Sequence, residues 1–238
     1  MKQICKLVVM LLLTFTAGVQ AQLVTYPESL NPGIPHNDDY TVRVRIPGGE
    51  WKDLFEYNVQ VDMDNVQKAS MVQFDMGSVV EVMVKKNNGS VREVTIRPLS
   101  KGIEYKQVQN AILFTLEKPQ YLSFEFDGDR LHNLHLFANP LETEKYDKEA
   151  KGIMYFSPGV HRPKDLPNNQ IRIPGNTIVY LAPGAVVKAK LLVDKAENVR
   201  IIGRGILDHP IRGIEVTDSK NVLIDGITVA VSYTHLTL

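Results

Sequence analysis

The sequence has almost no cysteine. The single one, Cys5, lies in a basic and apolar N-terminal segment. If that segment is removed, the remaining chain has no thiol and cannot form a disulfide, although secreted domains often depend on disulfides for stability. The mature protein would therefore be held together by the packing of its apolar residues, which make up 44% of the sequence.

The sequence also lacks an excess of either charge. It contains 27 basic and 27 acidic residues. Removing Lys2 and Lys6 with the N-terminal segment leaves 25 basic residues against 27 acidic ones, a net charge of −2. A chain with this balance has no basic patch for nucleic acid and no electrostatic attraction to a membrane surface, and we predict neither partner.

The N-terminal segment has the three parts of a secretory signal peptide. A short basic region (MKQICK) precedes an apolar stretch (LVVMLLLTFTAGV), and the small residues Val19 and Ala21 stand at −3 and −1 of a cleavage site. About 13 apolar residues are too few to span a bilayer. We predict that residues 1–21 are a signal peptide cleaved after Ala21, that the protein is secreted or periplasmic, and that no membrane association remains after cleavage.

Residues 22–140 have the pattern of short, half-polar strands. In YTVRVRI, Val42, Val44 and Ile46 fall on one face and the intervening polar residues on the other. The strands VEVMVKK and REVTIRP alternate in the same way, and Asn87-Asn88-Gly89 between them is typical of a hairpin turn. We predict an antiparallel β-sandwich domain, followed by a charged linker at residues 141–151.

Residues 152–230 repeat with a period in the low twenties. Corners of the form Ser-Pro-Gly and Ala-Pro-Gly begin 25 residues apart, at Ser157 and Ala182, and the asparagines Asn176, Asn198 and Asn221 follow at steps of 22 and 23. The fixed spacing of a leucine-rich repeat is missing. The period fits coils of a right-handed parallel β-helix stacked about 4.8 Å apart, in which the asparagines would bond to one another at one corner.

Two stretches resemble the first coils of polygalacturonase-like glycoside hydrolases (family 28). They are TIVYLAPGAVVKAKLLVDKAENVRIIGRGILDHP and GIEVTDSKNVLIDGITV. Residues 203–208, Gly-Arg-Gly-Ile-Leu-Asp, resemble the Gly-x-Gly-x-Ile-Asp of that family with Leu207 in place of isoleucine, and His209 replaces the usual glycine. A β-sandwich before the helix is also similar to the related family 49 dextranase and isopullulanase group. The resemblance implies hydrolysis of a glycosidic bond with inversion, by two carboxyl groups roughly 6.5–9.5 Å apart.

The catalytic motifs that the resemblance implies do not occur in the β-helix region. In family 28 they are Asn-x-Asp, Asp-Asp, Gly-His-Gly and Arg-x-Lys, in later coils. The chain has Asp38-Asp39 only before the first sandwich strands, no Gly-His-Gly, and no Arg-x-Lys after Asp208. We therefore leave the catalytic and substrate-binding residues unassigned, and expect the catalytic ones beyond Leu238.

Other chemically active residues have simpler explanations. We expect Asp208 to cap backbone N–H groups at a corner, His209 to be an exposed corner residue and Asp225 to belong to a turn beside Gly226. His132 and His135 would lie on opposite faces of a strand and could not share a metal ion. We predict no metal site and no cofactor.

The last eight residues, VSYTHLTL, continue no repeat. They are similar to the translation of an adapter used in DNA library preparation, and we interpret residues 231–238 as a sequencing artefact that interrupts a longer gene.

The sequence as a whole predicts an all-β secreted protein whose parent is an inverting polysaccharide hydrolase, with pectin (polygalacturonan) as the first candidate substrate. The 238-residue chain itself is expected to be inactive. Three alternatives stay open: a non-catalytic carbohydrate-binding or adhesive β-helix, a polysaccharide lyase on the same scaffold, and a dextranase-like α-glucan hydrolase.

Overall fold

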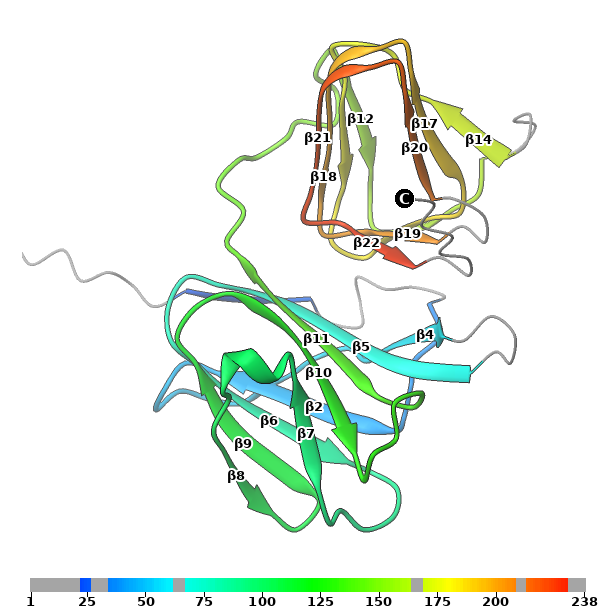
Figure 1. Ribbon diagram of the computed structural model, residues 1–238. Coiled ribbons are helices and arrows are strands. Elements are labelled where there is room, and N and C mark those ends of the chain that lie inside the picture. The colour runs from blue at the N-terminus through cyan, green and yellow to red at the C-terminus, as the bar shows by residue number, and fades with distance from the viewer. Residues whose placement is uncertain (1–21, 27–33, 62–66, 164–168, 209–212, 231–238) are drawn as a thin grey trace, which may run out of the picture.

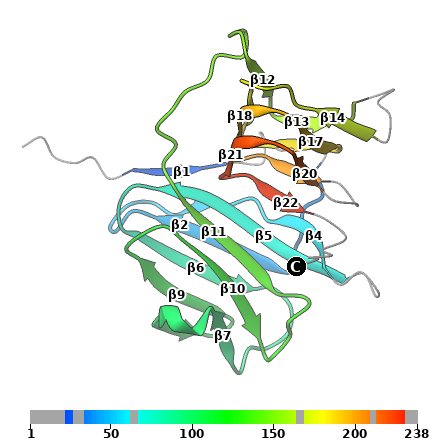
Figure 2. The same ribbon diagram turned by 45° about the horizontal axis from the view of Figure 1, so that its top comes forward.

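The computed structural model describes residues 22–26, 34–61, 67–163, 169–208 and 213–230. Over these residues the protein is nearly all β, and the one helical element is the 3-10 turn η2 (Leu99–Lys101). The strands form a β-sandwich and a three-sided parallel β-helix stacked on it (Figure 1, Figure 2). The predicted fold class is confirmed. The predicted signal peptide (1–21), His209 and residues 231–238 lie outside the described residues.

Two sheets face each other in the sandwich. The first contains β1 (Leu23–Thr25), β4 (Tyr57–Val61), β5 (Gln67–Met76), β7 (Val94–Arg97), β10 (Gln120–Phe126) and β11 (Leu134–Pro140). The second contains β2 (Tyr40–Arg45), β3 (Lys52–Asp53), β6 (Val80–Lys86), β8 (Tyr105–Val108) and β9 (Ala111–Leu116).

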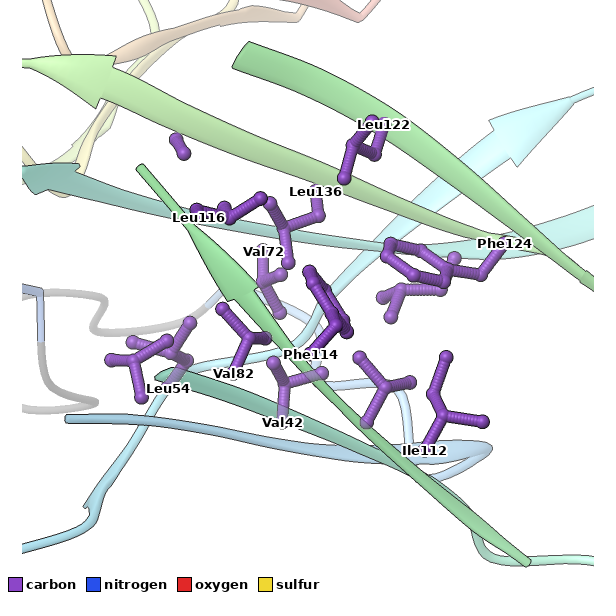
Figure 3. Close-up of a cluster of buried hydrophobic side chains, with 14 of the residues drawn as sticks. Val42, Leu54, Val72, Val82, Ile112, Phe114, Leu116, Leu122, Phe124 and Leu136 are labelled. Atoms are coloured by element: carbon purple, nitrogen blue, oxygen red, sulfur yellow. The ribbon is translucent and has the colours of Figure 1, made fainter. Parts of the chain in front are cut away.

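The core of the sandwich lies between these sheets. Figure 3 shows Val72, Phe124 and Leu136 of the first sheet meeting side chains of the second, including Val82 and Phe114. The alternation predicted for residues 40–46 is confirmed where β2 runs, because Val42 and Val44 are buried and Arg43 is exposed.

One prediction for the sandwich was wrong. The strands β6 and β7 do not form a hairpin: β6 pairs with β2 and β9 in one sheet, and β7 pairs with β10 in the other. Gly89 has a positive φ of 74°, but the turn carries the chain from one sheet of the sandwich to the other. Among the described strand pairs of the sandwich, β5 and β11 pair in parallel and the others are antiparallel, as predicted.

The β-helix has three faces. The first face contains β12 (Ile153–Phe156), β15 (Ile178–Leu181), β18 (Glu197–Gly203) and β21 (Lys220–Asp225). The second face contains β13 (Gly159–His161), β16 (Ala185–Val187), β19 (Ile206–Asp208) and β22 (Thr228–Ala230). The third face contains β14 (Gln170–Arg172), β17 (Lys190–Asp194) and β20 (Ile214–Thr217).

The register of these strands follows the repeats of the sequence. Tyr155 lies beside Tyr180, 25 residues later, as the Pro-Gly corners predicted. The asparagine ladder is also confirmed: Asn198 donates to Asn176 at 3.0 Å and Asn221 donates to Asn198 at 2.7 Å. All three residues have φ between 53° and 58°, a left-handed conformation that asparagine tolerates well.

The charged segment predicted as a linker, residues 141–151, forms no strand and runs along the first face of the β-helix. Tyr180 donates a hydrogen bond to Glu142 at 2.9 Å, and its ring lies 4.9 Å from that of Tyr146. Arg200 holds Glu144 by two hydrogen bonds of 2.8 and 3.0 Å. These bonds, with another from Tyr146, lower the pKa of Glu144 to about 2.

The second face of the β-helix rests on the sandwich. An apolar cluster joins Tyr57 and Met71 of the sandwich to Val186 and Ile206 of the helix. Beside it, Arg204 donates to Asp75 of β5 at 2.8 Å, and both side chains are buried. The two domains therefore share a continuous interface with an apolar part and a charged part.

Candidate functional site

At the edge of this interface, β4 and the start of β5 lie next to the second face of the β-helix (Figure 2). The residues of these elements line a groove. Its volume is about 440 Å³. Ligand sites in proteins commonly range from about 300 to 1,000 Å³. The groove is therefore large enough for a small molecule or for a few units of a polymer.

The floor of the groove is apolar. Tyr57 and Val59 come from β4, while Val186 and Ile206 come from successive coils of the β-helix. The ring of Tyr57 is held edge-on against Phe55 at 4.9 Å, and its side chain is buried. Because these residues belong to the cluster that joins the domains, the position of the floor depends on domain docking.

The rim of the groove is polar and mostly basic. Lys68 lies in β5 of the sandwich. The corner between the second and third faces of the β-helix contributes Arg162, Lys188 and Asp208. Lys188 forms an ion pair with Asp208 at 2.6 Å, and the backbone carbonyl of Lys188 accepts a hydrogen bond from Asn169 at 3.0 Å. A smaller hollow of about 350 Å³ continues past these residues.

Amide side chains from β4 complete the lining. Asn58 and Gln60 both border the groove. Among the described residues, the side-chain oxygen of Asn58 has no hydrogen-bond partner although it is shielded from water. The buried hydroxyl of Ser70, which pairs with Asn58 across β4 and β5, also has no partner among those residues, and Ser70 lies on the face of β5 that carries Val72 and Phe74 of the sandwich core.

The third face of the β-helix carries ion pairs between neighbouring coils. Arg172 donates to Asp194 at 2.6 Å, and Lys190 contacts Glu215. Each carboxylate therefore has a cation of an adjacent coil beside it. This arrangement stabilises the stacking, and it differs from an inverting pair, in which two carboxyl groups face each other across a water molecule.

Asp208 does not have the role that the sequence predicted. We expected it to cap backbone N–H groups, but it ends β19 and its carboxylate binds the ammonium group of Lys188. That partner lies one coil away, 20 residues back, where the strand register places it. Asp225 ends β21 and is exposed, and Gly226 follows with φ of 75°. This position agrees with the predicted turn.

The two histidines of the sandwich lie close in sequence but have different surroundings. His132 precedes β11 and contacts Asp129 at 3.0 Å and Gln67 at 3.1 Å. His135 lies within β11, and burial lowers its pKa. Over the part of the chain that the structure describes, no three His, Cys, Asp or Glu side chains are grouped so that they could hold a metal ion. No helix in that part is long and apolar enough to cross a membrane.

Sequence analysis missed the basic residues of the groove. Lys68 lies in β5 of the sandwich, whereas Arg162 and Lys188 follow β13 and β16 of the β-helix, and the three share no motif. The buried interface residue Arg204 did carry a signal, since it is the one charged residue of the otherwise apolar run IIGRGIL.

Comparison with known proteins supports the fold. No protein-family model matches the chain, and no curated protein sequence matches it either. Among solved structures, the chain is similar to Dex49A from Penicillium minioluteum, with a TM-score of 0.60 and 22% sequence identity. The match covers 74% of this chain and 46% of that chain, so the protein spans less than half the length of its structural neighbour.

Proposed function

We propose that this chain is the N-terminal part of a secreted, inverting glycoside hydrolase that cleaves a polysaccharide. The observation that carries the proposal is the shared arrangement with Dex49A, over both the sandwich and the first coils of the β-helix. A stacked helix suits this chemistry, because carboxylates on neighbouring coils can be set about 5 Å apart per step. The catalytic carboxylates would lie in coils beyond Leu238.

Two polysaccharide classes are candidates for the substrate. The coil motif at residues 203–208 favours polygalacturonan, by its resemblance to family 28. The likeness to Dex49A favours an α-glucan such as dextran, because family 49 includes dextranases. The second candidate has the support of the solved structure, whereas the first depends on the sequence motif.

The test begins with the gene. Genomic DNA should be sequenced past the codon of residue 230, and the longer protein should be expressed and incubated with polygalacturonate, dextran and pullulan. We expect reducing ends to appear with one of them, and proton NMR to show the inverted anomer first. The 238-residue chain serves as the control and should release no sugar.

The alternatives give different results in the same assay. A polysaccharide lyase would form an unsaturated, ultraviolet-absorbing product rather than a new hydrated reducing sugar. A carbohydrate-binding or adhesive protein would retain polysaccharide without cleaving it. Either result, or a genomic stop codon directly after Leu238, would contradict the proposal.

A further inference from the structure

We propose that the groove between the domains binds acidic sugars, with the carboxylates of a uronate chain held by Lys68 and Arg162. The site would lie apart from the catalytic coils. It would bind substrate at the junction between the sandwich and the β-helix. The role of this binding site in the parent protein rests on the proposed function, but binding to the site can be measured without hydrolysis.

The groove carries more positive than negative side chains. The groove is lined by three cationic side chains, those of Lys68, Arg162 and Lys188, and one carboxylate, that of Asp208. Asp208 pairs with Lys188. Lys68 and Arg162 are exposed, and neither has an ion-pair partner among the described residues. A guanidinium can bind a carboxylate through two parallel hydrogen bonds, so Arg162 suits this ligand.

The two cations come from different domains. Lys68 belongs to β5 of the sandwich, and Arg162 follows β13 of the β-helix. A ligand that contacts both must lie across the junction. Two cations contributed by different domains fit a chain with repeated negative charges better than a single small anion.

The neutral residues fit the rest of a sugar. Gln60 is exposed at the groove and offers an amide donor and acceptor to hydroxyl groups. The apolar floor of Tyr57, Val186 and Ile206 matches the C–H face of a pyranose ring. Apolar walls with a few placed polar groups are the usual composition of a ligand site.

Isothermal titration calorimetry on the 238-residue chain tests this assignment. The probes are trigalacturonate, which carries carboxylates, and isomaltotriose, which is neutral. We expect trigalacturonate to bind, isomaltotriose to bind at least tenfold more weakly, and added salt to weaken only the first. The double variant Lys68→Gln/Arg162→Gln should lose roughly 10-fold or more in affinity for trigalacturonate, by the size of a hydrogen bond to a charged group.

A matched control removes the same charge elsewhere. Lys101 and Lys118 border a separate hollow beside β8 and β9 of the sandwich, and Lys101→Gln/Lys118→Gln should leave trigalacturonate binding unchanged. Absence of trigalacturonate binding, equal binding of both probes, or an equal loss in both double variants would overturn the proposal. A longer protein that cleaves nothing would refute the proposed hydrolase and leave this binding result intact.

Discussion

At the scale of single residues, Gly203 shows how closely the coils approach each other. A Cβ at this position would lie 2.1 Å from the carbonyl oxygen of Leu181 on the preceding coil, and φ is 124°. Gly203→Ala therefore combines an unfavourable backbone conformation with a steric overlap. We expect it to lower the free energy of unfolding by roughly 3 kcal/mol, measured by urea denaturation.

Gly89 provides the control for this substitution. It also has a positive φ, 74°, but no atom lies within 4 Å of the position that a Cβ would take. Gly89→Ala should therefore cost only the backbone strain, about 1 kcal/mol. If both variants lost the same stability, close packing of coils at Gly203 would not be the cause.

At the scale of elements, the asparagine ladder links three successive coils. Asn198 lies in the middle, with a hydrogen bond to the asparagine on either side. Asn198→Gly keeps the left-handed backbone and loses only these exposed bonds, so we expect a loss of about 1 kcal/mol in urea denaturation. Asn198→Ala adds the strain of a positive φ and should lose about 1–2 kcal/mol more.

Asn176 is the matched position at the end of the ladder, with one such bond to Asn198. Asn176→Gly should therefore lower the free energy of unfolding by less than Asn198→Gly does. Equal stability of Asn198→Gly and the parent chain would show that the ladder contributes nothing beyond backbone conformation.

At the scale of the whole molecule, the buried pair of Arg204 and Asp75 couples the domains. Their side chains are 7% and 2% exposed. Burial opposes the charge of Arg204, but the hydrogen bond and charge of Asp75 outweigh it and raise the arginine pKa. Arg204→Met leaves a buried carboxylate without its cation, which costs about 3–5 kcal/mol. We expect the thermal unfolding to separate into two transitions and trypsin to cleave faster within residues 141–151.

Two further variants distinguish the effect of the buried Arg204–Asp75 pair on stability from that of an ion pair at the surface. Arg200→Gln removes an exposed partner of Glu144 and should change unfolding little, because water screens such pairs. Arg204→Met/Asp75→Leu removes both buried charges and should recover much of the lost stability. A single unfolding transition in Arg204→Met would argue against coupling through this pair.

Local periodicity in the sequence determined the elements of this protein. Alternation of apolar residues predicted buried Val42 and Val44 because side chains along a strand point to opposite faces. The steps between Asn176, Asn198 and Asn221 predicted the register of the coils, because each coil of a β-helix stacks on its neighbour in chain order. In both cases the partners of a residue lie at fixed offsets along the chain.

The tertiary structure alone decided which distant surfaces meet. The turn at Asn87-Asn88-Gly89 has hairpin composition, yet β6 and β7 enter opposite sheets because each finds its partners elsewhere in the sandwich. Asp208 pairs with Lys188 instead of backbone, and Arg204 crosses to Asp75, 129 residues away. Lys68 and Arg162 border one groove only because the domains dock. Docking depends on the shape and charge of surfaces that exist only once each domain has folded. A local pattern in the sequence does not specify those surfaces.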